Sequence, residues 1–242
     1  MWYVLLMLAL HPAVQDTLYS EITQILGTRQ PSYEDFPSLT YALCIMFETL
    51  RLFPSVVGVP KVAAEDTLLL GKYPIPRGTA VIFDIVHVHR DPEIWGPDSN
   101  DFNPSRFDSR NVRHRHRHSG SASKSEIDDD TSVSFGNEKI RVPCKGAFLP
   151  FSDGQRSCLG IPPSPLPPPL SPPLLSGRAD SLGKKFAQVE LVASLIMISR
   201  EWEIGLKEGW SPERVWGVID MSATIITLAP PEDIPLVFRK RV

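Results

Sequence analysis

The chain has 242 residues, 42% hydrophobic and 22% charged, and its 25 Lys and Arg against 28 Asp and Glu give a formal net charge of −3. These proportions exclude collagen, a coiled coil and wholesale disorder, and they indicate an ordinary globular protein or part of one. There is no basic excess, so no nucleic acid partner is expected. Three scattered Cys are too few for a disulfide framework.

The N-terminal run from Met1 to Leu10 is apolar throughout and ends at His11-Pro12. It is half as long as the roughly 20 residues that cross a bilayer, so we expect no membrane anchor in this chain. We interpret the run as the last turns of a buried helix. On this interpretation Met1 is an internal start and the chain is a fragment.

Two amphipathic helices are predicted next. Apolar side chains at helical spacing predict the first from Ala13 to Leu26, with Gly27 as its stop. The second is predicted to begin with Ser38 as its N-cap and to end at Leu52.

Short segments rich in Val, Ile and Leu follow, separated by turn residues, and they predict a small meander of strands. The expected strands are residues 59–63, 67–70 and 80–83. A short helix is predicted at 86–90, closed by Asp91-Pro92, and an irregular loop is predicted at 95–107.

Two segments break the globular pattern. Residues 111–137 alternate Arg with His and carry an Asp run, which predicts a solvated, disordered polar loop and not a metal site. Residues 161–183 hold eight of the 24 Pro, which favours polyproline II and forbids a regular helix. A largely buried helix is predicted from Lys184 onward, and short strands and turns from Trp202 to Phe238.

The segment from Phe151 to Gly160 reads Phe-Ser-Asp-Gly-Gln-Arg-Ser-Cys-Leu-Gly. It matches every fixed position of Phe-x-x-Gly-x-Arg-x-Cys-x-Gly and thus resembles the cysteine-ligand signature of the cytochrome P450 family. The resemblance implies that Cys158 ligates haem iron as a thiolate, a ligand that favours O–O cleavage. It also implies that Arg156 pairs with a haem propionate, that Gly154 and Gly160 let the backbone approach the porphyrin, and that Phe151 belongs to the same haem-binding set.

A second pair of motifs supports the resemblance. Glu48 and Arg51 stand at i and i+3 of one predicted helix, where opposite charges are neighbours. They resemble the family's Glu-x-x-Arg helix, and residues 102–107 resemble the stretch that adds a second arginine, here Arg106. The resemblance implies a buried network that holds the core around the haem.

Weaker assignments follow from the same analogy. Lys61 is expected to contact the other propionate, and the segment containing Val56, Val57 and Val59 is expected to line the substrate pocket, with plain core packing as the alternative for that segment. A turn at 217–222 is expected to line the same pocket.

We therefore expect a mainly α fold with small β-sheets (α+β), namely the C-terminal portion of the P450 fold, spanning residues 1–242. The resemblance implies a eukaryotic, microsomal-type haem-thiolate monooxygenase of fungal origin. It would oxidise a small apolar substrate with O2 and electrons from an NADPH-dependent flavoprotein reductase, at the endoplasmic reticulum membrane for the intact family member.

The Pro-rich insert at 161–183 departs from the family pattern, which runs directly from Cys-x-Gly into the next helix. We hypothesise that the insert is translated intron, because deleting it restores the motif. The chain also lacks the family's oxygen-activating helix, so it is expected to be inactive itself. The alternative is a truncated pseudoenzyme or Pro-rich interaction protein that never holds haem.

Overall fold

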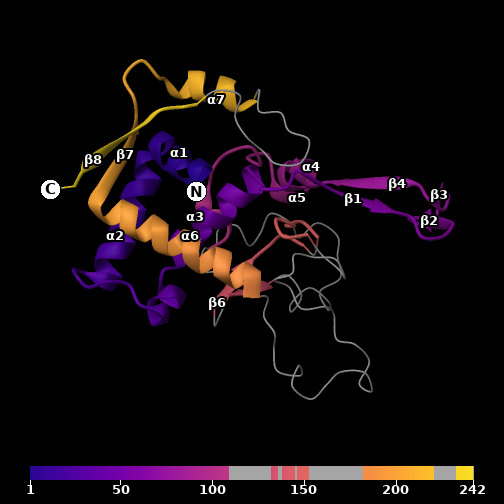
Figure 1. The fold of residues 1–242 in the computed structure, drawn as a ribbon, viewed down its shortest axis with the longest axis horizontal. Coiled ribbons are helices and arrows are strands. Elements are labelled where there is room, and N and C mark those ends of the chain that lie inside the picture. Colours follow the sequence, from indigo (N-terminus) through magenta and orange to yellow (C-terminus); the bar gives the residue numbers. More distant parts are fainter. Residues whose placement is uncertain (109–131, 136–137, 145, 153–181, 221–232, 242) are drawn as a thin grey trace.

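Four helices form the body of the molecule. The computed structural model describes residues 1–108, 132–135, 138–144, 146–152, 182–220 and 233–241. Within these, α3 (Thr40–Leu52) packs against α1 (Trp2–Leu10), α2 (Pro12–Leu26) and α6 (Leu182–Glu201), as Figure 1 shows. Because three helices cover it, α3 is buried along most of its length.

The first two predicted helices are confirmed. The apolar N-terminal run forms α1, whose Val4, Leu6, Met7 and Leu8 are buried. Pro12 stands in the first turn of α2, where its missing N–H costs no hydrogen bond. The helix ends at Gly27, which adopts a positive φ of 56° that is strained for residues with a Cβ.

The predicted N-cap of the central helix is wrong. Ser38 lies at the end of a 3-10 helix, η1 (Tyr33–Ser38), and α3 begins two residues later without a side-chain cap of its own. The carboxylate of Glu21 on α2 takes that role, since it accepts hydrogen bonds from the backbone N–H groups of Tyr41 at 2.8 Å and Ala42 at 3.1 Å. The unpaired donors of the helix terminus are thus satisfied from a neighbouring helix.

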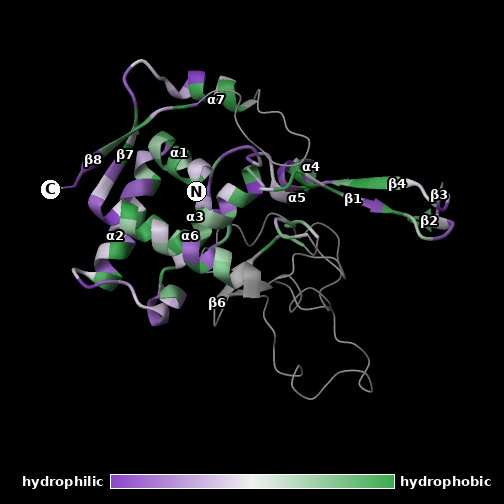
Figure 2. Cartoon of the chain, in the orientation of Figure 1, coloured by the Kyte–Doolittle hydropathy of each residue, from purple (hydrophilic) through white to green (hydrophobic). Residues whose placement is uncertain are grey.

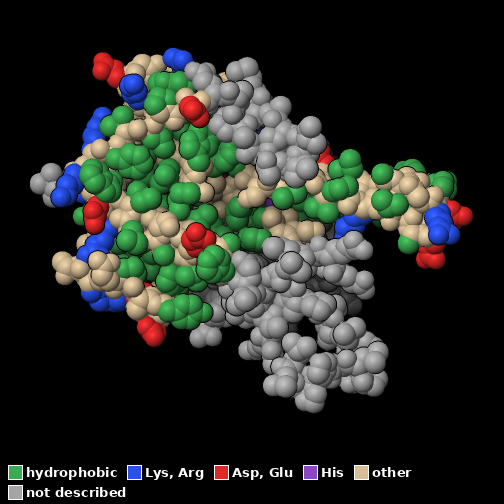
Figure 3. Space-filling model, in the orientation of Figure 1, with side chains coloured by type: hydrophobic (Ala, Val, Ile, Leu, Met, Phe, Trp, Pro, Cys, Tyr) green, Lys and Arg blue, Asp and Glu red, His purple; other side chains and the backbone are tan. Residues whose placement is uncertain are grey.

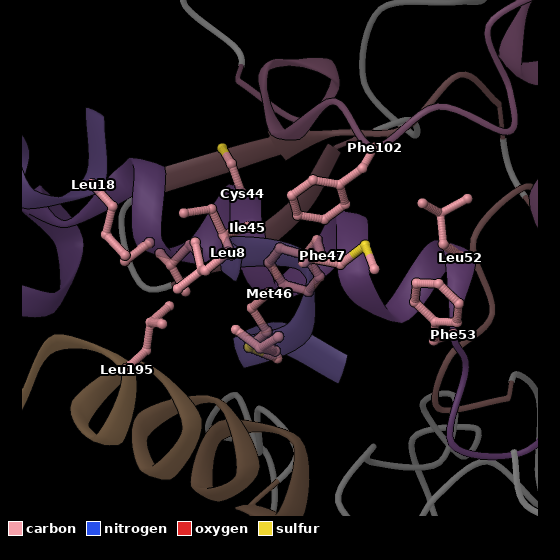
Figure 4. Close-up of a cluster of buried hydrophobic side chains, with 14 of the residues drawn as sticks. Leu8, Leu18, Cys44, Ile45, Met46, Phe47, Leu52, Phe53, Phe102 and Leu195 are labelled. Atoms are coloured by element: carbon pink, nitrogen blue, oxygen red, sulfur yellow. The ribbon is translucent and has the colours of Figure 1, made fainter. Parts of the chain in front are cut away.

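The hydrophobic core lies where α3 meets α1, α2 and α6 (Figure 4). Burying one such Leu or Phe side chain contributes about 1.5–3 kcal/mol. The labelled core side chains are Leu8, Leu18, Cys44, Ile45, Met46, Phe47, Leu52, Phe53, Phe102 and Leu195.

A β-structured arm, residues 58–84, projects from the helical body (Figures 1 and 2). Strand β1 (Gly58–Val62) pairs antiparallel with β4 (Ala80–Asp84), and β2 (Thr67–Leu69) pairs antiparallel with β3 (Tyr73–Ile75). The predicted meander is confirmed, with β3 as an addition. Pro74 was expected to separate strands, but it is accommodated in this short two-stranded sheet.

After the arm the chain forms α4 (Ile85–Arg90), α5 (Pro92–Trp95) and η2 (Pro104–Arg106). The predicted short helix is confirmed as α4. Asp91-Pro92 does more than close it, because the Asp91 carboxylate accepts from the Glu93 N–H at 2.9 Å and caps α5.

The prediction of a disordered loop over 111–137 is wrong at its end. Residues Ser132–Phe135 form β5, which pairs antiparallel with β6 (Glu138–Arg141). The rest of that loop lies outside the described residues, as does the Pro-rich insert up to residue 181. Helix α6 begins at Leu182, two residues earlier than predicted, so the last two residues of the predicted insert are helical.

The C-terminal part contains a helix that the sequence analysis missed. Strand β7 (Trp202–Leu206) pairs antiparallel with β8 (Leu236–Lys240), and α7 (Pro212–Asp220) lies between them in sequence. The predicted turn at 217–222 is wrong over residues 217–220, which belong to α7, and its last two residues lie outside the described part of the chain. Ser211 accepts from the Arg214 N–H at 3.3 Å, so a Ser-Pro start signal was present.

The architecture confirms the predicted fold class of helices with small antiparallel sheets. Among the described helices, none is both long enough and apolar enough to cross a membrane.

Candidate functional site

The centre of the candidate site is an ion pair inside the helical body. Glu48 and Arg51 lie one turn apart on α3, and neither side chain is exposed to solvent. The guanidinium binds the carboxylate in bidentate fashion, from Nε to Oε2 at 2.8 Å and from Nη2 to Oε1 at 2.8 Å. Charge-assisted pairs of this geometry are among the strongest hydrogen bonds in proteins.

All five N–H donors of Arg51 have acceptors. Besides the two bonds to Glu48, Nη1 donates to the carbonyls of His89 at 2.8 Å and Ser99 at 2.5 Å, and Nη2 donates to the carbonyl of Asp101 at 3.2 Å. A fully satisfied guanidinium tolerates burial. It therefore fixes the backbone of α4 and of the segment after α5 relative to α3.

Arg106 adds a second cation to the same carboxylate. Its Nε lies 3.4 Å from Oε1 of Glu48, its Nη1 donates to the Trp95 carbonyl at 3.0 Å, and its Nη2 donates to the Asp98 carbonyl at 2.7 Å. The Asp98 carboxylate lies 3.2 Å from the same Nη2. Two cations and two carboxylates balance the formal charge, so the network carries no net charge into the core.

The buried network thus comprises Glu48, Arg51 and Arg106, with the partly exposed Asp98 at its rim, and the structure brings together all three network residues predicted from sequence. Asp98 was not predicted, because its pairing depends on the loop geometry between α5 and η2.

His89 connects this network to the segment that leads toward Cys158. It is fully buried on α4, and its Nε2 accepts a hydrogen bond from the Leu149 N–H at 2.7 Å. Its Nδ1 lies 3.2 Å from the Arg51 carbonyl, so the neutral ring carries its proton on Nδ1. The ring stacks on Phe148, with centroids 5.2 Å apart.

Burial lowers the pKa of His89 to about 4, with the Arg51 charge acting in the same direction and the hydrogen bond to the Arg51 carbonyl opposing it. The neutral form therefore dominates at neutral pH. Sequence reasoning missed this residue as a connecting group, since its side-chain partners lie 38 and 60 residues away along the chain.

A pocket of about 190 Å³ lies between the base of the arm and the segment after residue 146. Its lining residues are Val59, Lys61, Phe83, Ile85, Gly146, Leu149 and Ser152. The Nζ of Lys61 lies 5.6 Å from the centroid of the Phe83 ring. Among the described lining residues, apolar side chains thus form a wall and Lys61 supplies a cation.

Some of the residues predicted for the haem and substrate sites line this pocket, and others lie beside it. Val59 and Lys61 both line this pocket, and Val56 and Val57 lie just before β1, half-buried. Phe151 packs against the core from its partly buried position. Ser152 adopts a positive φ of 61°, which is uncommon for a residue with a side chain.

Of the residues predicted to bind haem, Lys61 and Phe151 belong to the described part of the chain, and the other four lie outside it. These are Gly154, Arg156, Cys158 and Gly160. The described part includes the first two residues of the signature, Phe151 and Ser152. The apolar wall of the pocket suits a porphyrin ring, and the Lys61 cation suits a porphyrin carboxylate. A Cys thiolate is a soft ligand for iron, so the chemistry of these residues fits haem.

Comparison with known proteins gives one family. A sequence model of the family described as Cytochrome P450 matches residues 1–162. Members of this family hold haem iron through a thiolate ligand.

Named relatives come from several kingdoms. Secologanin synthase 1 of Catharanthus roseus is 34% identical over 155 residues, covering 64% of this chain and 24% of the relative. Cytochrome P450 monooxygenase 124 of Postia placenta is 30% identical, covering 99% of this chain and 38% of the relative. Bifunctional cytochrome P450/NADPH--P450 reductase 2 of Bacillus subtilis is 32% identical over 151 residues, covering 62% of this chain and 12% of the relative.

A solved structure shares the fold. The crystal structure of a cytochrome P450, CYP102L1, superposes with a TM-score of 0.66 at 22% sequence identity, covering 99% of this chain and 41% of that one. The chain spans about a quarter of the length of the first relatives and about two fifths of this structure.

Proposed function

Because the chain belongs to the cytochrome P450 family, we propose that it is the C-terminal part of a haem-thiolate monooxygenase that oxidises a small apolar substrate with O2. The observation that carries the proposal is the extent of the family match. It runs to residue 162 and so contains the whole signature from Phe151 to Gly160.

In this proposal each site residue has a defined task. Cys158 supplies the thiolate ligand, while Arg156 and Lys61 pair with the two propionates. Haem, when bound, supplies the oxygen-activating iron, whose reactivity depends on the axial ligand. Val56, Val57 and Val59 offer an apolar surface to the substrate, and the buried network keeps α3, α4 and η2 in fixed positions around the site.

The buried network supports a structural task for its own members. Glu48, Arg51 and Arg106 have their charges satisfied by one another and by backbone carbonyls inside the helical body. Their contribution is to position the surrounding backbone, since pre-oriented groups react faster than mobile ones.

Electrons come, in this proposal, from an NADPH-dependent flavoprotein reductase. The Bacillus subtilis relative, whose name joins a cytochrome P450 to an NADPH–P450 reductase, supports this partner. By family resemblance we further propose a microsomal-type protein at the endoplasmic reticulum membrane. The relative from Postia placenta supports a fungal origin.

We propose that the 242-residue chain by itself does not oxidise a substrate. It spans about a quarter of the length of its first relatives, and the family match stops at residue 162, one residue after the Pro-rich insert begins. That boundary supports the hypothesis that residues 161–183 are translated intron. The alternative, an inactive or Pro-rich interaction protein without haem, predicts no oxidation in any form of the chain.

The proposal is tested with two longer polypeptides, each joining this chain to the missing N-terminal part of a related P450, with and without residues 161–183. Both are supplied with a P450 reductase, NADPH, labelled O2 and a panel of small apolar compounds. We expect label in an oxidised product only from the polypeptide that lacks the insert. If neither polypeptide incorporates label although both fold and bind haem, the monooxygenase proposal is wrong.

A further inference from the structure

The segment from Gly146 to Ser152 enters the haem-ligand signature, and the imidazole of His89 binds its backbone to the helical body. Its Leu149 N–H donates to Nε2 of His89 at 2.7 Å, and its Leu149 carbonyl accepts from the Ser152 N–H at 3.0 Å. Leu149 therefore begins a turn that ends at Ser152, six residues before Cys158.

This turn holds an unfavourable backbone conformation. Ser152 has a positive φ of 61°, which for a residue other than Gly persists only where surrounding contacts enforce it. The contacts on its N-terminal side are the His89 bond to Leu149 and the packing of Phe148 against His89, Phe47 and Phe107. Phe148 fixes the position of the segment, whereas the hydrogen bond fixes the orientation of its backbone.

His89 is in turn held by the buried network. The Nη1 of Arg51 donates to the His89 carbonyl at 2.8 Å, while Nδ1 of His89 lies 3.2 Å from the Arg51 carbonyl. The two residues are thus linked in both directions between α3 and α4. A continuous chain of contacts runs from Glu48 through Arg51 and His89 to Leu149.

We propose that His89 is a positioning residue, which uses the acceptor on its Nε2 to hold the turn from Leu149 to Ser152 and thereby orients the segment that carries Cys158. The inference rests on the proposed function only in its last step, the orientation of the haem ligand. The hold on the turn is a property of this chain's own residues.

The first test measures hydrogen exchange of the Leu149 amide by NMR in the 242-residue chain, selectively labelled on leucine and without added haem. His89→Phe keeps a buried ring against Phe148 but removes the acceptor. We expect the Leu149 amide to exchange at least about tenfold faster in this variant, corresponding to a loss of about 1.4 kcal/mol.

Two further variants identify the cause. His89→Gln places an amide oxygen within reach of the Leu149 N–H, so we expect it to restore protection to within about threefold of the parent chain. His87→Phe is the matched control, because His87 is exposed on the same helix, and we expect no change. Unchanged exchange in His89→Phe overturns the proposal, as does lost protection at Leu149 in a folded His89→Gln.

If His89→Phe exposes amides throughout α3, the variant has unfolded, and His89→Gln alone decides between these outcomes. The second test adds haem to the longer polypeptide that lacks residues 161–183 and compares reduced carbon monoxide spectra. We expect a smaller thiolate-type fraction in His89→Phe and its recovery in His89→Gln. If the parent polypeptide binds no haem, the proposed function fails, while the hydrogen-exchange result still decides whether His89 holds the turn.

Discussion

The buried network and the β-structured arm lie next to each other in the chain, but they differ in which side chains they expose to water. In the network, the side chains of Glu48 and Arg51 are excluded from water, and every donor of Arg51 is satisfied. In the arm, apolar side chains face solvent, as in Leu70, which is 81% exposed, and Ile82, which is 69% exposed. Figure 3 shows hydrophobic side chains, in green, on the surface of the projecting arm.

This difference in burial indicates which region contributes more to the free energy of unfolding. A buried charge is tolerated when partners surround it, and each partner then becomes indispensable. An exposed apolar side chain contributes little to folding, because folding does not remove it from water. Substitutions of similar size should therefore have large effects in the network and small effects in the arm.

The largest effect is expected for Glu48→Gln. Removing this carboxylate leaves two buried guanidinium groups facing a neutral amide, which should lower the free energy of unfolding by about 3–5 kcal/mol. Urea denaturation followed by circular dichroism measures the loss. Glu65→Gln on the exposed arm is the matched control and should change stability by less than about 0.5 kcal/mol. Equal effects at both positions would remove the distinction between the regions.

The second-largest effect is expected from His89, whose titration makes the free energy of unfolding depend on pH. Its folded-state pKa of about 4 lies below the unfolded value of 6.5, so the unfolded chain binds the proton more readily. The contribution of neutral His89 to the free energy of unfolding is therefore fully present above pH 6.5. It is lost as the pH falls toward 4, by about 3 kcal/mol in total.

Urea denaturation at several pH values between 7 and 4 measures this loss. His89→Gln should reduce the slope in that range, whereas His87→Gln, on the exposed side of the same helix, should leave it unchanged. An identical slope in His89→Gln and the parent chain would contradict the assignment.

A third substitution tests the cap supplied to α3 by a neighbouring helix. Glu21→Gln replaces a carboxylate that accepts from two backbone N–H groups with a group that offers a single acceptor oxygen. We expect a loss of about 1 kcal/mol, the usual magnitude for a helix cap. Asp16→Asn on the exposed face of α2 serves as the comparison, and thermal denaturation of the two variants should separate them by several degrees.

The smallest effect is expected at the tip of the arm. Leu70 has a positive φ of 53° and is exposed, so Leu70→Asn places a residue that tolerates this conformation where no packing is lost. The free energy of unfolding should change by less than about 0.5 kcal/mol, with reduced binding of a hydrophobic dye. A loss above 1 kcal/mol would show that the arm is packed as the core is.

The sequence predicted the elements whose signals are local. The periodicity of α2 and the Gly27 stop were sufficient, and the positions of Glu48 and Arg51 one turn apart indicated their pairing. The start of α3 was missed because its cap is the Glu21 side chain of another helix, about 20 residues away.

The candidate site, like the fold, was predictable from the sequence only where the signal is local. Its charged residues carry motifs, but the carbonyls that satisfy Arg51 and the bond from Leu149 to His89 arise from pairings 38 to 60 residues apart. No local pattern encodes such distances. α7 was missed for a different reason, since a turn was expected at 217–222 by family analogy although Ser211 and Pro212 signal a helix start.

The central claim, that Cys158 ligates haem iron, is tested most directly by the reduced carbon monoxide difference spectrum of the longer polypeptide without residues 161–183. We predict a thiolate-type Soret band that disappears in Cys158→Ser and persists in Cys144→Ser, a change at an exposed thiol. A band that survives unchanged in Cys158→Ser would contradict the account.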